Sequence, residues 1–346
     1  MVPKEYIPNK HNPKVSILMS VYNGEQFLQD SIGSILDQTF GNFEFLIIND
    51  ASTDNSRNVI LSYKDPRIRL IDNNSNLGLT KSLNKGIELS CGEYIARMDC
   101  DDISLPTRLE KQVNFMDDHE NILICGTWGE TFGLKKEIWK LPTVHEEIKV
   151  HLYFNNVFIH SSVMLRKNLL NEYKLKYNPE FRYTQDYELW TRCAKVGRLA
   201  NLPEVLVRYR VSNQQIGCRH KNQQTDLADS IRICELKNLG ADFSDEDYQL
   251  HKRISLYTVD CSREFVRRSE KWLLYIRKLL SDKTSNNIVA DIIFEKWFFI
   301  CNTSIMLGPW VWWKCISSQI KGSKLLRSVI KSLLLSLRGM FKQWMG

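Results

Sequence analysis

The chain has 346 residues, of which 43% are hydrophobic and 25% are charged, as is typical of a globular protein. Its nine cysteines, odd in number and without a Cys-x-x-Cys pair, argue against a disulfide-stapled secreted scaffold and favour a reducing compartment. The net charge of +7 resides in residues 297–346, which contain seven Lys or Arg and no Asp or Glu. Residues 1–14 lack the apolar core of a signal peptide, so we expect a cytosolic protein.

The first hundred residues alternate apolar runs with helical segments. The predicted strands are Val15–Val21, Phe43–Ile48, Ile68–Ile71 and Tyr94–Met98, and the predicted helices cover residues 26–36, 52–63 and 79–89. Strands without polar alternation, interleaved with helices, predict a parallel sheet that is covered on both faces. Right-handed crossovers would bring the polar strand-to-helix junctions to one edge of this sheet.

The second half is mixed and then helical. Short strands are predicted at Ile122–Gly126, Ser162–Arg166 and Val205–Tyr209, with helices at residues 146–153 and 187–196 and helical sequence over residues 223–307. The predicted fold class is therefore α/β, with a Rossmann-like, mostly parallel sheet flanked by helices and a helical C-terminal extension. We expect a main domain at residues 1–217, a helical extension at 218–296 and a separate tail at 297–346.

Three aspartates follow the fourth predicted strand. Asp99, Asp101 and Asp102 would lie at the carboxyl edge of the sheet, where open α/β folds bind their ligands. Carboxylates this close repel one another unless a cation or strong donors lie among them. Taken alone, the turn fits a metal site and an acidic helix cap equally well.

Several blocks in the same order resemble family 2 glycosyltransferases. They are PKVSILMSVYNGEQFLQDSIGSILDQTF with GNFEFLIINDASTD, NLGLTKSLNKGIELSCGEYIARMDCDDISLPTRLEKQ, FRYTQDYELWTR and VLVRYRVSNQQIG, which together cover residues 13–217. The order of the blocks is more specific than any single motif. The resemblance implies a GT-A fold, a sugar-nucleotide donor and inversion of the anomeric centre.

The resemblance also assigns residues to the donor. Those implied to contact its base, ribose or phosphates are Val21, Tyr22, Asn23, Glu25, Asp50, Asn76, Lys81 and Asp99. Uracil would lie against the first three, Asp50 would accept its imide N–H, and Glu25 and Asp99 would meet the ribose. For Asp50 an Asx turn into Ser52 is an alternative, and Lys81 fits a solvated surface position equally well.

The same resemblance implies the reacting groups. Asp101, in a DXD motif, would bind Mg²⁺ or Mn²⁺ with the donor diphosphate, and Asp102 would support it or cap a helix. Asp186 would be the general base, although relatives often have Glu before it where this chain has Gln185. His160 is a further candidate for metal or phosphate, with a core histidine as the alternative.

The tail has an amphipathic pattern. Lys324, Arg327, Lys331, Arg338 and Lys342 fall in one sector of a helix and large apolar residues fall in the other, as in helices that lie on anionic lipid. The aromatic stretch Trp297–Trp313 is interrupted by Gly308 and Pro309, so we expect it to lie on or dip into a bilayer. A basic helix packed on the main domain is the alternative. Nucleic acid is disfavoured because no recognition motif accompanies the charge.

These features predict an inverting, metal-dependent hexosyltransferase at the cytoplasmic face of the inner membrane, peripheral or monotopic. It would move a hexose or N-acetylhexosamine from a UDP-sugar to a saccharide on a polyprenyl diphosphate, for capsule, O-antigen or exopolysaccharide. The alternatives are a non-catalytic saccharide-binding or membrane scaffold protein, and another nucleotide-using enzyme such as a nucleotidyltransferase. A Gly-rich phosphate loop after the first strand, which the nucleotide-using alternatives would favour, is missing from the sequence.

Overall fold

The computed structural model describes residues 13–212 and 220–322, and the chain divides into two compact units. Unit 1 comprises residues up to 148 together with 156–228, and unit 2 comprises 149–155 together with 229 onward. The boundary expected after residue 217 lies outside the described residues. The boundary expected after residue 296 falls inside helix α12 (Asn286–Thr303).

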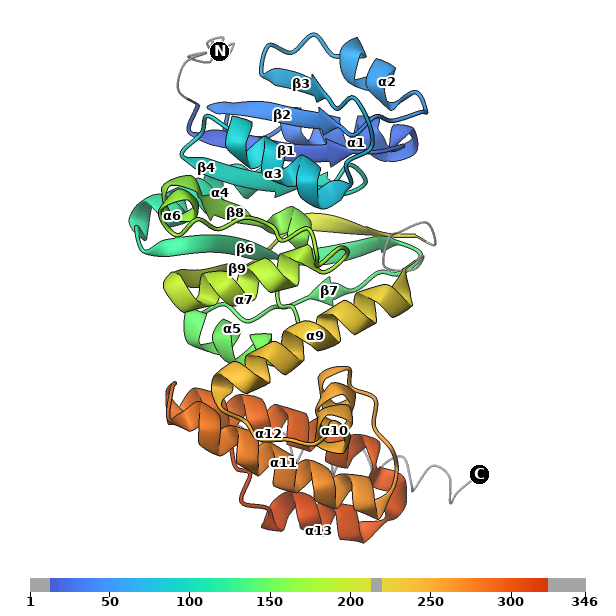
Figure 1. The fold of residues 1–346 in the computed structure, drawn as a ribbon, viewed down its shortest axis with the longest axis vertical. Coiled ribbons are helices and arrows are strands. Elements are labelled where there is room, and N and C mark those ends of the chain that lie inside the picture. The colour runs from blue at the N-terminus through green and yellow to red at the C-terminus, as the bar shows by residue number, and fades with distance from the viewer. Residues whose placement is uncertain (1–12, 213–219, 323–346) are drawn as a thin grey trace, which may run out of the picture. The chain divides into compact units, whose positions relative to one another are not determined.

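Unit 1 is built on one nine-stranded sheet (Figure 1). Its strands are β1 (Val15–Val21), β2 (Phe43–Asn49), β3 (Ile68–Asp72), β4 (Tyr94–Met98), β5 (Ile103–Ser104), β6 (Ile122–Gly133), β7 (Ile138–Trp139), β8 (Met164–Arg166) and β9 (Arg198–Val211). The strand order is β3-β2-β1-β4-β8-β6-β9-β5, and β7 pairs with β6. Strands β3, β2, β1 and β4 are mutually parallel, which confirms the predicted α/β class.

The strand order reverses direction at β1, which has β2 on one side and β4 on the other. Such a reversal leaves a crevice beyond the carboxyl ends of the two strands, because their crossover helices lie on opposite faces. The polar turns that follow β1, β2 and β4 therefore meet at one edge of the sheet.

Helices cover both faces of the parallel strands, as expected. The helices of unit 1 are α1 (Glu25–Leu36), α2 (Ser56–Ser62), α3 (Leu79–Leu89), α4 (Arg108–Asp118), α6 (Lys167–Glu172) and α7 (Gln185–Val196). Helices α1 and α4 pack on the face that carries Ile17 and Met19. Helix α3 packs on the other face, where a Cβ added to Gly86 would lie 2.1 Å from Leu18 Cδ1. This glycine permits the close approach of helix and sheet.

Several predicted strands have different limits in the structure, and the strand expected at Ile122–Gly126 extends to Gly133 as β6. The segment expected as Ser162–Arg166 begins with a 3₁₀ turn, η1 (His160–Ser162), and only Met164–Arg166 is strand. The last strand is longer than expected and spans Arg198–Val211, because it pairs with β6 along nearly its whole length. Pairing between segments far apart in sequence fixes these limits, and local hydrophobic pattern does not contain that information.

Unit 2 is helical. It contains α10 (Asp245–Ser255), α11 (Arg263–Ser281), α12, η2 (Ile305–Leu307) and α13 (Pro309–Ser317), and helices α5 (His145–Leu152) and α9 (Lys221–Leu239) contain residues of both units. Its core includes Trp272, Ile293 and Trp297. Trp297 is fully buried, so the aromatic stretch that begins there is part of a packed helical unit. Within the described residues no helix is both long and apolar enough to cross a membrane.

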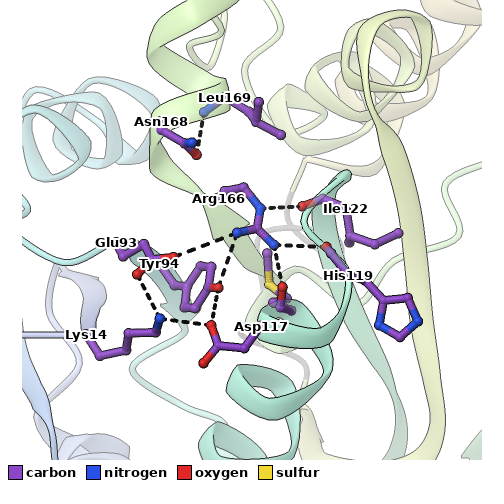
Figure 2. Close-up of polar contacts among 10 residues, drawn as sticks. Lys14, Glu93, Tyr94, Asp117, His119, Ile122, Arg166, Asn168 and Leu169 are labelled. Carbon is purple, nitrogen blue, oxygen red and sulfur yellow. Dashed lines mark hydrogen bonds and ion pairs between the residues drawn. The ribbon is translucent and has the colours of Figure 1, made fainter.

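A buried arginine links strands and helix at the amino end of β4, opposite the polar turns (Figure 2). Arg166 donates to the carbonyl oxygens of Met116 at 2.5 Å, His119 at 3.0 Å and Ile122 at 2.9 Å. It also donates to the hydroxyl of Tyr94 at 3.2 Å. The guanidinium therefore adds a charged donor to carbonyls at the end of α4 and the start of β6, two of which also accept a backbone N–H.

We expect Arg166→Met to destabilise unit 1 by about 2–4 kcal/mol, because buried carbonyls lose their donors. Calorimetric unfolding of the full chain measures this change. The control is Arg57→Met, since Arg57 forms an exposed ion pair with Asp72, and such pairs contribute about 0–1 kcal/mol. Equal unfolding temperatures for the two variants would contradict a structural role for Arg166.

Candidate active site

The turns after β1 and β2 hold each other through reciprocal hydrogen bonds. Asn23 accepts from the backbone N–H of Thr53 at 2.8 Å, and the N–H of Asn23 donates to Ser52 Oγ at 3.1 Å. Glu25 accepts from the N–H of Asn55 at 2.7 Å. Asn23 and Ala51 have positive φ angles of 52° and 58°, a conformation that non-glycine residues adopt at a cost. The two turns are therefore fixed against each other, and Tyr22 is exposed beside them.

Asp50 anchors the loop that leads into α3. Its buried carboxylate accepts from Asn73 Nδ2 at 2.8 Å and from the backbone N–H groups of Leu77 at 2.9 Å and Gly78 at 2.8 Å. The Asx-type contact with Ser52 is made by Asn49, whose Oδ1 accepts from the Ser52 N–H at 3.1 Å. Asp50 therefore shapes the loop after β3.

Asn76 and Lys81 are the other predicted donor residues near α3, and Asn84 lies about one turn further along this helix. Asn76 and Lys81 are exposed, on the loop and on the first turn of the helix. Asn84 instead exchanges two hydrogen bonds with the backbone of Tyr177, at 2.8 and 3.0 Å. Asn76 and Lys81 are thus available to a ligand, whereas Asn84 braces the segment before α7.

The acidic turn after β4 is held by groups from distant segments. Asp99 forms an ion pair with Arg97 at 2.5 Å. Asp102 is fully buried, accepts from the N–H of Arg210 at 2.8 Å and accepts from the Ser161 hydroxyl. Arg210 Nε also donates to the carbonyl oxygen of Asp101 at 2.8 Å. Asp102 therefore fixes the turn against β9 and η1, and Asp101 is left partly exposed.

The carboxylates of this turn repel one another. Burial, and then the charge of Asp99, raises the pKa of Asp101 to about 6. Burial and the charges of Asp101 and Asp99 raise the pKa of Asp102 well above its usual value. Within the described residues, no group of three or more His, Cys, Asp or Glu side chains could hold a metal ion by itself. The turn suits a cation that takes one or two carboxylates and completes its shell with phosphate oxygens and water.

Arg97 is a buried cation at the centre of the site. Burial lowers its pKa, but Asp99, Tyr177 and Asp102 outweigh that effect and raise it. Its side chain is 1% exposed, and its Nε and Nη1 atoms have no hydrogen-bond partner. Burial of a guanidinium with one ion pair costs free energy. The nearby carboxylates of Asp99 and Asp102 offset this cost and keep Arg97 charged.

Asp186 lies in the first turn of α7. Its Oδ2 accepts from Asn156 Nδ2 at 2.8 Å. Burial raises the pKa of Asp186, although the N–H of Tyr187, Asn156 and Arg97 act in the opposite direction. Tyr183, three residues earlier, has a φ of 76°, a strained conformation that turns the chain into the helix. A carboxylate with a raised pKa is a stronger base than an ordinary aspartate.

Two tyrosines of unit 1 have pKa values that are raised by burial and by the carboxylates of the site. Burial raises the pKa of Tyr209, and the charges of Asp102, Asp99, Asp101 and Asp186 raise it further. Burial likewise raises the pKa of Tyr177, which interacts with Arg97, Asp186 and Asp99. The acidic turn and Asp186 are linked through one segment, since Ser161 donates to Asp102 and Asn156 donates to Asp186 at 2.8 Å. Neither tyrosine was singled out by sequence alone, since each is one aromatic residue in an ordinary segment.

His160 belongs to an aromatic cluster in this neighbourhood. Its Nε2 is 2.8 Å from the hydroxyl of Tyr177, and its ring centroid is 6.1 Å from that of Trp190. Burial, and then Arg97, lowers the pKa of His160 far below its usual value, so the ring is neutral. Trp190 is fully buried, and Trp128 donates its indole N–H to Leu141 O at 2.8 Å. The structure therefore gives both tryptophans packing roles.

Residues 16–174 match the profile named "Glycosyl transferase family 2". An uncharacterized glycosyltransferase of Haemophilus influenzae is 36% identical over 233 residues, which are 64% of this chain and 72% of that protein. The chain belongs to glycosyl transferase family 2. The relatives of this family 2 chain include the amylovoran biosynthesis glycosyltransferase AmsE of Erwinia amylovora, 31% identical over 212 residues (59% of this chain, 79% of the relative).

A further relative has a more specific name. The UDP-Glc:alpha-D-GlcNAc-diphosphoundecaprenol beta-1,3-glucosyltransferase WfgD of Escherichia coli is 30% identical over 205 residues, or 58% of this chain and 79% of that protein. Glycosyltransferases of polysaccharide biosynthesis are therefore among the relatives of this family 2 chain.

Solved structures support the fold. TarS of S. aureus, residues 1–349 in complex with UDP, has a TM-score of 0.55 at 15% identity and covers 93% of this chain and 92% of its own. The mannosyltransferase PcManGT of Pyrobaculum calidifontis, in complex with GDP-Man and Mn²⁺, has a TM-score of 0.54 at 13% identity. The match covers 94% of this chain and 88% of that protein. The family 2 chain thus has the GT-A fold that its sequence predicted.

Proposed function

We propose that this protein is an inverting, metal-dependent glycosyltransferase that uses a UDP-sugar. It transfers a hexose or N-acetylhexosamine to a saccharide carried on a polyprenyl diphosphate. The observation that carries the proposal is that one short segment contacts both parts of the site, since Ser161 donates to Asp102 and Asn156 donates to Asp186 at 2.8 Å. The name of the E. coli relative supports a lipid-linked acceptor, and the UDP complex of TarS supports the nucleotide.

The donor occupies the crevice between the ends of β1 and β4. The residues proposed to bind it are Val21, Tyr22, Asn23, Glu25, Asp50, Asn76, Lys81 and Asp99. Uracil lies against the turn that follows β1, and exposed Lys81 at the start of α3 faces the phosphates, where a helix N-terminus also favours negative charge. Since Asp50 already holds the N–H groups of Leu77 and Gly78, its contact with uracil uses the remaining acceptor capacity of its oxygens.

Asp101, with His160 as a second candidate, holds Mg²⁺ or Mn²⁺ together with the donor diphosphate. When bound, the ion neutralises charge that develops on the leaving diphosphate. The Mn²⁺ that accompanies GDP-Man in the complex of the Pyrobaculum mannosyltransferase supports a divalent cation together with the donor. Asp102 does not face the ion but holds the turn through Ser161 and Arg210.

Asp186 acts as the general base. It takes the proton of the acceptor hydroxyl as that oxygen forms a bond to the anomeric carbon of the sugar. The bond from the anomeric carbon to the phosphate oxygen breaks, and its electron pair leaves with the diphosphate. Because attack and departure occur on opposite sides of the carbon, the anomeric configuration inverts.

A donor screen tests this proposal. UDP-, GDP- and dTDP-sugars are incubated with the full chain, with and without Mn²⁺, and nucleotide release is measured. We expect UDP release from UDP-glucose or UDP-N-acetylglucosamine to be about tenfold faster than nucleotide release from GDP- or dTDP-sugars. We expect this release only when the cation is present. Release from no nucleotide sugar, or equal release with EDTA, contradicts the proposal.

The proposed site of action is the cytoplasmic face of the inner membrane, with the protein bound peripherally. The basic residues of the predicted amphipathic tail lie outside the described residues, but helix α13 precedes them. Met306, Trp313 and Ile316 are exposed at spacings of seven and three, whereas Val311 and Cys315 of α13 are buried. An exposed apolar face beside a basic segment fits an anionic lipid surface.

We expect the double change Trp313→Asp and Ile316→Asp to weaken binding to vesicles of phosphatidylglycerol and phosphatidylethanolamine by about tenfold or more. Flotation of the full chain measures this. Trp313 is 62% exposed, so the control is Leu134→Asp in unit 1, where the leucine is 66% exposed. Equal loss in the control, or no flotation of the unaltered chain, contradicts the proposed membrane surface.

A further inference from the structure

Two aromatic side chains from different strands meet on one face of the sheet in unit 1. The ring centroids of Trp139 on β7 and Tyr209 on β9 are 5.2 Å apart, with an interplanar angle of 38°. In the pairing register, Trp139 lies opposite Gly129 and Tyr209 lies opposite Thr131 of β6. Residues two apart on a strand share a face, so both rings stand on the same side of the sheet.

Gly129 makes room on this face. A Cβ added to Gly129 would lie 2.3 Å from Ile159 Cδ1, so the segment before η1 covers the same side of β6. His160 and Ser161 follow in η1, and Ser161 bonds to Asp102. The aromatic pair therefore stands on the face of the sheet on which η1 meets the acidic turn.

Tyr209 connects the pair to the reacting groups. Its ring contacts Trp139, and the backbone N–H of Arg210, the next residue on β9, donates to the carboxylate of Asp102 at 2.8 Å. Tyr209 therefore joins Trp139 to the acidic turn. The segment that contacts this turn through Ser161 also contacts Asp186, through Asn156 at 2.8 Å.

Trp139 differs from the other tryptophans of unit 1. Trp190 is fully buried. Trp128 and Trp139 are both half-buried, but Trp128 uses its indole N–H in a hydrogen bond to Leu141, and Trp139 lies on a two-residue strand. A pyranose presents a face of C–H groups that is apolar and nearly flat, and its hydroxyl groups remain at the rim. An aromatic ring of this kind supplies the matching apolar surface.

We propose that Trp139 and Tyr209 form a subsite for the acceptor saccharide, in which one pyranose ring stacks on Trp139. The proposal rests on the function proposed above, because it places the acceptor hydroxyl beside Asp186. The subsite selects for a sugar acceptor through stacking, and Tyr209 sets the distance between the stacked ring and the site of transfer.

The experiment observes the indole N–H signals of the full chain, which has nine tryptophans, by ¹H–¹⁵N NMR in the presence of UDP and Mg²⁺. Trp139→Phe identifies the Trp139 signal, and the probes are the methyl pyranosides of glucose, galactose and N-acetylglucosamine. We expect at least one probe to shift the Trp139 signal. We also expect saturation transfer from protein to sugar ring protons to fall about tenfold in Trp139→Ala.

The eight other indole signals show whether Trp139→Ala is folded, and Trp139→Phe retains a ring and should keep part of the transfer. An unmoved Trp139 signal with every probe, or equal transfer in the alanine variant, overturns the subsite. Nucleotide release from UDP-sugars is measured separately in the same preparations. Release without an effect at Trp139 rejects the subsite alone, and an effect at Trp139 without release rejects the proposed transferase reaction alone.

Discussion

Asp186→Asn is expected to lower the rate of sugar transfer by about 10³-fold, because an amide cannot take the acceptor proton. The change conserves shape, and the asparagine can still accept the hydrogen bond that Asn156 donates to Asp186. Binding of UDP should therefore change less than about twofold, since the base does not touch the nucleotide. Transfer is measured at saturating donor, and UDP binding is measured by calorimetry.

The control for Asp186 is Glu188→Gln in the same turn of α7. Glu188 is paired with Arg192 at 2.7 Å and has no place in the proposed reaction. We expect its transfer rate to stay within about twofold of the unaltered chain. A rate above one tenth of the unaltered value in Asp186→Asn would show that another group is the base.

Asp101→Asn is expected to abolish transfer and, at the same time, to stabilise the protein in the absence of cations. Burial and the charge of Asp99 disfavour the ionised form of Asp101 and raise its pKa to about 6 in the folded state. At pH 7.5 the carboxylate is nevertheless ionised, and this negative charge destabilises the folded protein. Removal of that charge should increase the free energy of unfolding by on the order of 1–2 kcal/mol at pH 7.5. Thermal unfolding in EDTA measures this gain.

The pH dependence gives the sign of this effect. A carboxyl group whose folded-state pKa is raised lowers stability progressively as pH rises from about 4 to about 6, and the cost is fully present above that range. The gain in Asp101→Asn should therefore vanish near pH 4. Asp118→Asn, on the exposed side of α4, is the control and should change stability by less than about 0.5 kcal/mol. A gain that is the same at both pH values would contradict charge repulsion as its cause.

The sequence was sufficient to predict the parallel half of the sheet. Val15–Val21 and Tyr94–Met98 are strands with the predicted limits, because continuous apolar runs are the signature of strands buried on both faces. The segment Ser162–Arg166 was wrong in part, since its first residue belongs to η1. There the hydroxyls of Ser161 and Ser162 make specific tertiary hydrogen bonds that no periodicity predicts.

Much of the candidate site could not be predicted from sequence. The sequence motif identified the acidic turn. It did not show that Asp102 accepts hydrogen bonds from Ser161 and Arg210 and so has a structural role. Tyr209 and Trp139 are about seventy residues apart, and only the pairing of β6 with both β7 and β9 brings them together. Long-range register of this kind is set by the whole sheet, and local sequence does not encode it.

The tail illustrates the same limit. The aromatic composition of Trp297–Trp313 predicted a segment apart from the globular protein, yet Trp297 is fully buried in the core of unit 2. Composition cannot tell a buried tryptophan from one that faces a bilayer. The structure separates a buried tryptophan from an exposed one, because Trp297 is fully buried and Trp313 is 62% exposed.

Calorimetric titration of UDP, with and without Mn²⁺, tests the central claim most directly. The claim is that a nucleotide diphosphate and a cation share the crevice bordered by Asp101. The unaltered chain should bind UDP about tenfold tighter with Mn²⁺ than with EDTA, and Asp101→Asn should lose that difference while Asp186→Asn keeps it. Absence of UDP binding, or an undiminished effect of Mn²⁺ in Asp101→Asn, would contradict the account.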